Sequence, residues 1–480
     1  PTTDTLKRMT IRRLVWALLC LLFSAWLTTG RAEETKPRPN VVIFLADDLG
    51  YGDLRCHGNP IVQTPHLDAF AREAVEFTRF HVSPVCAPTR ASLMTGRYNF
   101  RTGVCDVFGK GCQMDPAEVT VAEALRGAGY ATGIFGKWHL GDDPTRDPNA
   151  QGFAEALVHS GPAMRNYFNP EQLRNGAKQR FQGYCMDIFT DHAIEFIRQH
   201  RSRPFFLYLP ANLIHTPLQV GRDLAAPYDG LGLRDSTVKI YGMIRSVDNN
   251  FGRLRAVLQE LGLDANTLFV FTSDNGPCSG SAPLDRFMAG LHGLKGTVYE
   301  NGIRTPCFIR WPAGLPGPAK VDRLAAHFDL MPTILEACGV PPPAGVKLDG
   351  LSLLPLLRDP AAKWPDRTLF FQWDSGQEPR RGQAFTVLTE KWKLVQPCGM
   401  DLPQQQHIRD RYTELCALQG RGRRTIEGPP RYELYAISSD LGETQDVASQ
   451  RPDLVENMRQ KYDAWFTDVC ARWIEPSVPK

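Results

Sequence analysis

Residues 40–52 read Asn-Val-Val-Ile-Phe-Leu-Ala-Asp-Asp-Leu-Gly-Tyr-Gly. In this stretch an apolar run over 40–46, rich in β-branched residues, ends abruptly in two adjacent aspartates, Asp47 and Asp48. Such a run is typical of a strand that is buried on both faces of a parallel sheet. Ligands of open α/β sheets bind at the carboxyl ends of the strands, so the two aspartates are well placed to contribute to a site.

The succession of buried strand, polar strand end and amphipathic helix recurs along the chain. It predicts an α/β fold, in which a large mixed, mainly parallel sheet is sandwiched by helices. The strands expected after the first lie at 129–136, 205–209 and 267–272, and the helices at 64–77, 119–128, 186–198 and 240–261.

A change of pattern marks the C-terminal part of the chain. Residues 353–364 are punctuated by prolines and indicate a boundary, so we expect a catalytic domain over 34–364 and a smaller α+β domain over 365–480. Short strand-like runs predict an antiparallel sheet in this second domain, followed by a closing amphipathic helix; they lie at 368–373, 384–388, 392–395 and 431–435, with the helix at 452–465. Residues 421–430 are rich in Arg and Gly and are expected to form an exposed loop.

The N-terminal residues have the pattern of an export signal. Basic residues between Lys7 and Arg13 precede an apolar run over 14–27, and small residues follow up to Ala32. This pattern predicts a secretory signal peptide over 1–33 and a secreted or periplasmic protein. A membrane anchor is the alternative, but the run is too short to span a bilayer comfortably, so we expect no stable membrane span.

Composition narrows the classes of function. The 480 residues carry 55 basic and 52 acidic side chains, for a formal charge of +3, which argues against nucleic acid as a partner. The twelve cysteines permit disulfides in an exported chain, although their pairing cannot be deduced from the sequence. Cys105 and Cys112 are close enough in sequence to close a short loop.

Polar residues follow several of the predicted strands, and a parallel sheet brings such strand ends to one edge. Three carboxylates and one amide would form an all-oxygen site, which favours Ca²⁺ or Mg²⁺ over zinc. Each pair taken alone would more often be a solvated turn or a satisfied polar group, but their joint placement favours a metal site. The residues are Asp47, Asp48, Asp274 and Asn275, with Lys137, His139 and His215 at other strand ends.

A second decisive stretch lies at 84–96 and reads Pro-Val-Cys-Ala-Pro-Thr-Arg-Ala-Ser-Leu-Met-Thr-Gly. Cys86 is expected at the N-terminus of a buried helix with Arg90 one turn further on, and both features stabilise negative charge. A structural cysteine beside a surface arginine is the alternative. However, Cys-x-Pro-x-Arg followed by an apolar pair, Thr and Gly resembles the signature of the type I, formylglycine-dependent sulfatases, a family within the alkaline-phosphatase-like superfamily.

The resemblance to sulfatases covers nearly the whole chain after the signal. The family's second signature, Gly-Tyr-x-Thr-x-x-x-Gly-Lys-x-His, is matched at 129–139, and 293–304 is similar to the block around its substrate-binding lysine. Residues 434–443 resemble the family's C-terminal strand and turn. Phe135 and Asn301 depart from the residues common in the family, in ways that concern packing.

The resemblance implies the chemistry of the site. Cys86 would be oxidised to formylglycine by a maturation enzyme, and the hydrated aldehyde would be the nucleophile. The metal, usually Ca²⁺ with Mg²⁺ as the alternative, would be bound by Asp47, Asp48, Asp274, Asn275 and modified Cys86. Arg90 and Lys137 would hold formylglycine and the sulfate oxygens, and His139 would hydrogen-bond the hydrated aldehyde. His215 and Lys295 would contact the ester and its leaving oxygen. Ser160 is a weaker candidate for a hydroxyl that contacts the site.

The sequence thus predicts a sulfuric ester hydrolase that acts on a sulfated carbohydrate or small molecule. Two alternatives are a phosphonate or phosphate monoester hydrolase of the same superfamily and an inactive, exported carbohydrate-binding homologue. Trp373 could stack on a sugar, although a core tryptophan is the commoner case. The sequence does not indicate the oligomeric state.

Overall fold

A ten-stranded mixed sheet forms the centre of the protein, in the order β11-β2-β10-β9-β1-β8-β4-β5-β6-β7. The computed structural model describes residue 16 and residues 37–278, 285–373, 376–397 and 430–474. Contacts group Pro39–Lys480 into one unit, to which this description applies. The strands are β1 Asn40–Ala46, β2 Val75–Phe77, β4 Ala131–Lys137, β5 Glu155–His159, β6 Glu171–Arg174, β7 Ala177–Arg180, β8 Phe205–Pro210, β9 Thr267–Ser273, β10 Cys307–Arg310 and β11 Ala319–Val321.

The five central strands, from β9 to β5, are parallel, and their pairing places the strand ends side by side. In β1 every residue is buried, as its apolar run predicts. Ala46 pairs with Ser273 of β9, so Asp47 and Asp274 follow at the same level of the sheet. The mainly parallel sheet expected from the sequence is therefore confirmed. Antiparallel pairs occur where β10 meets β9 and β2, and at β5-β6-β7.

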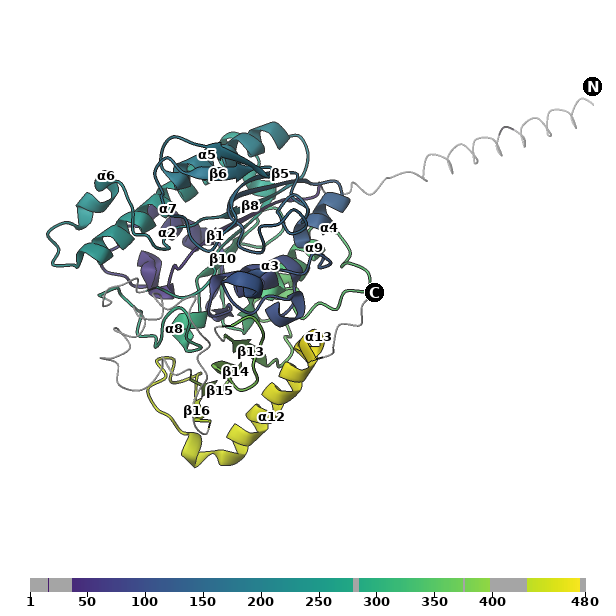
Figure 1. The fold of residues 1–480 in the computed structure, drawn as a ribbon. Helices are drawn as coiled ribbons and strands as arrows, with labels where there is room; N and C mark the ends of the chain where they lie inside the picture. The colour runs from purple at the N-terminus through teal and green to yellow at the C-terminus, as the bar shows by residue number, and fades with distance from the viewer. Residues whose placement is uncertain (1–15, 17–36, 279–284, 374–375, 398–429, 475–480) are drawn as a thin grey trace, which may run out of the picture. The chain divides into compact units, whose positions relative to one another are not determined.

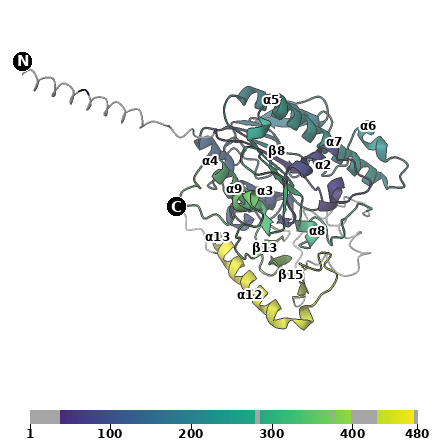
Figure 2. The ribbon, with the colours of Figure 1, turned by 180° about the vertical axis from the view of Figure 1, so that it is seen from behind.

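Helices cover both faces of the sheet (Figure 1 and Figure 2). Successive residues of a strand point to opposite faces, and accordingly Val41 and Ile43 join one hydrophobic core while Val42 and Phe44 join the other. The first core includes residues from α3 Cys86–Thr95, α4 Val121–Gly127, α9 Leu330–Ala337 and α10 Leu354–Arg358. The second includes residues from α2 Pro65–Glu73, α5 Cys185–His200 and α7 Asp235–Glu260.

The C-terminal part forms a separate four-stranded antiparallel sheet, β13-β14-β15-β16, as predicted. On it packs α12 Pro452–Val469, whose Tyr462 stacks on Phe385 with ring centroids 3.5 Å apart. The domain boundary near residue 364 stays a prediction. The strands are β13 Leu369–Gln372, β14 Phe385–Leu388, β15 Lys393–Gln396 and β16 Glu433–Tyr435. Other short strands and α-helices are β3 Phe80–His81, β12 Ala325–Ala326, α6 Arg222–Ala225, α8 Glu300–Ile303 and α13 Ala471–Ile474.

Two expectations need correction or fall outside the described residues. The helix predicted over 64–77 ends at Glu73, because Ala74 is extended and the following residues form β2, which pairs with β10 and β11. The signal peptide, apart from Trp16, and the loop at 421–429 lie outside the described residues. Among the helices described, none has the length and apolarity needed to cross a membrane.

Candidate active site

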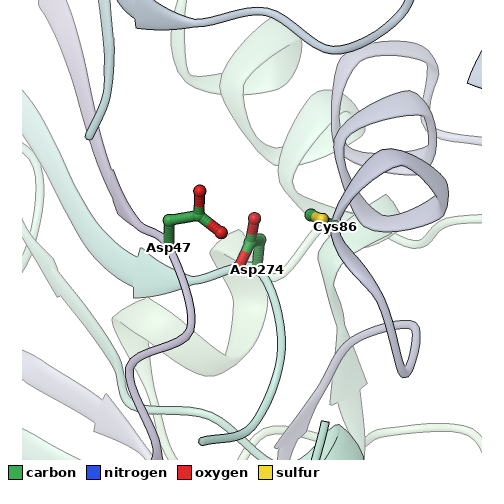
Figure 3. A group of neighbouring side chains, drawn as sticks. All are labelled: Asp47, Cys86 and Asp274. Carbon is green, nitrogen blue, oxygen red and sulfur yellow. The ribbon is translucent and has the colours of Figure 1, made fainter. Parts of the chain in front are cut away.

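The predicted polar residues meet at the carboxyl edge of the central strands. Asp47 and Asp48 follow β1, Asp274 follows β9, and Cys86 begins α3. The carboxylates of Asp47 and Asp274 face a common space with Cys86 beside it (Figure 3). One ligand atom from each of these three residues lies within 4.8 Å of the others, and the same holds for Asp47, Asp48 and His215.

Four of the five expected metal ligands are fully buried, and they are Asp47, Asp48, Asp274 and Asn275. Three of their oxygens, Asp47 Oδ1, Asp48 Oδ2 and Asn275 Oδ1, accept no hydrogen bond from the described residues. A buried polar atom without a partner costs about 1–3 kcal/mol, which a bound cation would offset. The donor set and these unpaired oxygens therefore fit a hard cation such as Ca²⁺ or Mg²⁺.

Three basic side chains neutralise the carboxylates. Arg90 donates from Nε and Nη2 to Asp274 Oδ2, at 3.0 and 2.6 Å. Lys137 Nζ lies 2.8 Å from Asp47 Oδ2, and Lys295 Nζ lies 2.5 Å from Asp48 Oδ1. The structure therefore brings these predicted residues together, and their roles stay a prediction.

The electrostatic environments of Asp47 and Asp274 shift their pKa values in opposite directions. Burial opposes ionisation of Asp47, but the surrounding positive groups, led by Lys137, hold its pKa well below the usual range. For Asp274, burial and the neighbouring Asp47 raise the pKa to about 7, although Arg90 acts in the opposite direction. A cation in the space between these carboxylates would favour the ionised form of Asp274.

Cys86 differs from the sequence-based expectation in one respect. Its side chain is buried, and burial raises the pKa of the thiol even though Lys137 and Lys295 lie nearby. The nearby positive charges act in the expected direction, but burial outweighs them, so the pKa of the thiol is raised and not lowered. Arg90 is not a surface residue but is fully buried, where it binds Asp274 and donates to the Lys137 carbonyl.

His139 lies two residues after Lys137, the last residue of β4, and has a positive φ of 63°. Its Nε2 is 2.8 Å from the Val107 carbonyl, which can only accept, so Nε2 carries the proton. No described residue bonds its Nδ1. Burial and Lys137 hold the pKa of His139 well below the usual range, so the ring is neutral with an unprotonated Nδ1.

Gly136 of β4 occupies a position where only glycine fits. Its φ is 140°, and a Cβ there would lie 2.0 Å from the Pro210 carbonyl oxygen of the neighbouring strand. The close approach of β4 and β8 thus leaves no room for a side chain just before Lys137 and His139.

His215 and Lys295 both lie beside Asp48. His215 Nε2 is 4.0 Å from Asp48 Oδ2, and Nδ1 is 2.7 Å from the Thr216 carbonyl oxygen. The His215 side chain is 17% exposed, more than that of Lys295 at 9%. Burial and the positive charge of Lys295 lower the pKa of His215, so it is neutral near pH 7.

Sequence reasoning missed two groups near the site. The first is His159, which ends β5 and pairs in register with Lys137. Its Nε2 has no hydrogen-bond partner among the described residues. Burial and the charge of Lys137 lower the pKa of His159 to about 4. The sequence analysis named its neighbour Ser160 instead, whose role stays a prediction. Neither residue belongs to a motif, and only the paired strand reveals the position of His159.

The second missed group supports the turn after β1. Arg286 and Asp53 form a buried ion pair, and Arg286 also donates to the Asp48 carbonyl at 3.4 Å. Asp53 accepts from the Gly50 amide at 2.6 Å. These bonds stabilise the turn in which Asp48 has a positive φ of 64°. The sequence around Asp53 does not indicate that its partner is an arginine distant in the chain.

Two expectations concerning cysteine and tryptophan are also resolved. Cys112 is a free thiol that donates to Gly109, so no disulfide joins it to Cys105. Trp373 packs against the first core and donates through Nε1 to Asp106, which agrees with a structural role.

Comparisons with known proteins agree with this geometry. The family model described as Sulfatase matches residues 39–340, and the model described as N-sulphoglucosamine sulphohydrolase, C-terminal, matches 290–403. Arylsulfatase A of Homo sapiens is 33% identical over 488 residues, which cover 92% of this chain and 89% of the relative. N-acetylgalactosamine-6-sulfatase of Canis lupus familiaris is 33% identical over 441 residues, covering 82% and 80%.

Solved structures share the fold. The crystal structure of Ps i-CgsB in complex with k-i-k-neocarrahexaose has a TM-score of 0.75 and 26% identity, and the match covers 89% of this chain and 92% of that one. The phosphonate monoester hydrolase SpPMH of Silicibacter pomeroyi has a TM-score of 0.63 at 21% identity, covering 90% and 96%. At that identity the likeness to SpPMH concerns the fold alone.

Proposed function

Because the chain belongs to the sulfatase family and is a sulfate ester hydrolase, we propose that it cleaves sulfate monoesters of carbohydrates with a formylglycine formed from Cys86. The observation that supports this best is the convergence of Asp47, Asp48 and Asp274 on Cys86, with unpaired buried oxygens among them. The substrate, the modification and the identity of the cation are parts of the proposal.

The cation would be Ca²⁺, with Mg²⁺ as the alternative, and Asp47, Asp48, Asp274, Asn275 and modified Cys86 would hold it. When bound, it would supply positive charge beside the nucleophile and the sulfate oxygens. Formylglycine at position 86 would supply, in its hydrated form, one hydroxyl to attack sulfur and a second whose deprotonation releases sulfate. A serine could supply only the first, which is why an oxidised cysteine suits this reaction.

The basic residues act on the charge of the substrate. Arg90 and Lys137, fixed by Asp274 and Asp47, hold the modified residue 86 and the sulfate oxygens. Lys295 reaches the same space from the loop before α8. A sulfate monoester is anionic, and groups that are already oriented stabilise the charge that develops in the transition state without further reorganisation.

The histidines act on protons. His139 is neutral and presents an unprotonated Nδ1, which suits it as the base for a hydroxyl of residue 86. His215 is the more exposed of the two, and with Lys295 it suits the protonation of the departing alkoxide oxygen. The lowered pKa of His215 in the ligand-free protein implies that the anionic substrate must raise it for this role.

A carbohydrate substrate is supported by the name of one relative, an N-acetylgalactosamine-6-sulfatase, and by the solved structure of Ps i-CgsB in complex with k-i-k-neocarrahexaose. The test is sulfate release from a panel of defined sulfated mono- and oligosaccharides, with an aryl sulfate, an aryl phosphate and an aryl phosphonate monoester as references. Release from at least one sugar above the aryl sulfate rate is expected. Turnover of only the phosphate or phosphonate would overturn the proposal, and turnover of the aryl sulfate alone would overturn its carbohydrate part.

We also propose that the protein is exported, since the N-terminal pattern is that of a signal peptide. Amino-terminal sequencing of the protein recovered outside the cytoplasm tests this, with a new terminus near residue 33 expected. Recovery only in the cytoplasm with the apolar run intact would contradict it.

A further inference from the structure

Asp106 joins the loop between α3 and α4 to the segment that follows β13. It is 6% exposed. Its carboxylate accepts from the Val107 amide at 2.7 Å, from Trp373 Nε1 at 3.1 Å and from the Gly376 amide at 3.0 Å. We call these four residues, Asp106, Val107, Trp373 and Gly376, the Asp106 cluster. It connects the loop between α3 and α4 to the end of β13, the first strand of the C-terminal sheet, through one buried carboxylate.

The loop around this carboxylate is tightly constrained. The amides of Cys105 and Asp106 both donate to the Gly111 carbonyl, at 2.8 and 2.9 Å. A Cβ on Gly111 would lie 2.7 Å from the Gly376 carbonyl oxygen, so the two segments are in close contact. Cys105 Sγ adds a bond to the same carbonyl at 3.7 Å. The position of the loop therefore depends on the segment after β13.

The residue next to Asp106 contacts the site directly. The Val107 carbonyl accepts the Nε2 proton of His139 at 2.8 Å, while the Val107 amide donates to Asp106. The carbonyl of Val107, the residue after Asp106, thus determines which ring nitrogen of His139 is protonated. If the carbonyl moved, neither nitrogen would be fixed as donor or acceptor.

We propose that Asp106 is a positioning residue for His139, which acts by fixing the Val107 carbonyl and thereby the Nε2-protonated tautomer. The inference rests on the proposed function for the catalytic role of His139, but the tautomer can be measured without any substrate. It also gives the C-terminal sheet a part in the reaction, since Trp373 and Gly376 follow its first strand.

The requirement for a carboxylate follows from the count of donors. At least three N–H groups, all from described residues, converge on the two oxygens of Asp106. An asparagine has one acceptor oxygen, and its NH₂ group would face an N–H donor from Val107, Trp373 or Gly376. Asp106→Asn therefore changes little in volume but breaks the cluster.

The experiment uses the full-length, converted enzyme labelled with ¹⁵N-histidine. The variants are Asp106→Asn and the milder Trp373→Phe, which keeps a ring and removes one donor. Trp364→Phe is the matched control, since no described residue accepts a bond from its Nε1. The His139 resonances are assigned by their loss in His139→Gln, and kcat and KM are measured on an aryl sulfate. Near-UV circular dichroism establishes that each variant is folded.

In the wild type and in Trp364→Phe, His139 is expected to show protonated Nε2 and unprotonated Nδ1. Asp106→Asn should give mixed tautomers and a kcat lowered about tenfold with KM nearly unchanged, the effect expected for one charge-assisted hydrogen bond. Trp373→Phe should shift both readouts in the same direction by less.

The inference would be overturned if Asp106→Asn and Trp373→Phe both fold and both keep the wild-type tautomer of His139 and the wild-type kcat. If Asp106→Asn does not fold, Trp373→Phe alone decides in the same way. A mixed tautomer in a protein that cleaves no sulfate ester would support the positioning role and contradict the proposed function, so the two can fail separately.

Discussion

Asn275 Nδ2 donates to Asp48 Oδ1 at 2.8 Å, although 227 positions separate the two residues. The same amide group donates to the Gly276 carbonyl at 2.9 Å. Both bonds use the nitrogen of the amide, and Asn275 Oδ1 accepts no hydrogen bond from the described residues, so it is available as a ligand atom. The orientation of a neutral side chain thus adds a fourth oxygen to the candidate metal site without adding a fourth negative charge.

Removal of the metal should abolish activity, and Ca²⁺ or Mg²⁺ should restore it while Zn²⁺ should not, because the proposed ligands are oxygens. Ca²⁺ should also raise the melting temperature of the chelated protein, since it binds only the folded site. Activity and differential scanning fluorimetry measure the two effects. Full activity in a preparation free of metal by elemental analysis would contradict the assignment.

Asp274→Ala should lose nearly all activity and the thermal response to Ca²⁺. The change removes a ligand and the nearer of the two carboxylates that pair with buried Arg90, since Asp47 remains at 3.8 Å, so the loss in stability should be at most about 3–5 kcal/mol. Chemical denaturation measures the stability. Asp322→Ala, at a residue whose side chain bonds Thr78 on the exposed surface, is the control and should match the wild type. An Asp274→Ala protein that keeps the Ca²⁺ response would exclude Asp274 as a ligand.

His215→Ala should slow substrates with poor leaving groups far more than activated aryl sulfates, because a good leaving group departs without a proton. A series of aryl sulfates of increasing phenol pKa, compared by kcat/KM, gives the slope in the wild type and in the variant. A steeper dependence is expected in the variant. Parallel slopes would indicate that His215 binds sulfate and does not act as the acid.

The peptide that contains Cys86 should show by mass spectrometry the replacement of a thiol by an aldehyde and should react with carbonyl reagents. Pro88→Ala should leave the thiol intact and the enzyme inactive, since the maturation enzyme is expected to read Cys-x-Pro-x-Arg. Cys86→Ser should fold and be inactive in a host that oxidises only cysteine. Full activity with an unmodified Cys86 would refute the formylglycine assignment.

Stability should depend on pH through Glu443, which lies beside Lys393 and Glu300. Burial raises the pKa of Glu443 from 4.5 to about 8, although Lys393 opposes this. The unfolded chain loses this proton near 4.5 and the folded protein near 8, so in between the folded state binds more protons. The free energy of unfolding should therefore fall as pH rises through this window. Urea denaturation should show a shallower fall in Glu443→Gln, and equal slopes would show that Glu443 does not titrate in this window.

The central strands and the metal-binding candidates could be predicted because each apolar run ends in a charged or amide residue. The β1 and β9 runs are buried throughout, and Asp47 and Asp274 follow them directly. Edge strands gave no such signal. In β7, Ala177–Arg180, every residue is exposed, so no apolar pattern marks it.

Other features depend on residues that are distant in the sequence. Trp373 and Asp106 are 267 positions apart, and nothing local to either indicates the other. The raised pKa of Cys86 was missed for a different reason. The charges around it were predicted correctly, but the cost of burying a thiolate outweighs their attraction, and burial at a helix start is decided by tertiary packing.

The helix that carries Cys86 has a consequence for the order of biosynthetic events. Every residue of α3, from Cys86 to Thr95, is buried. An enzyme that recognises the Cys86, Pro88 and Arg90 side chains would need them on an extended, accessible segment, so oxidation would have to precede folding. A chain that folded first would keep its thiol permanently, and purified unmodified protein should resist later conversion in the test tube unless it is first denatured.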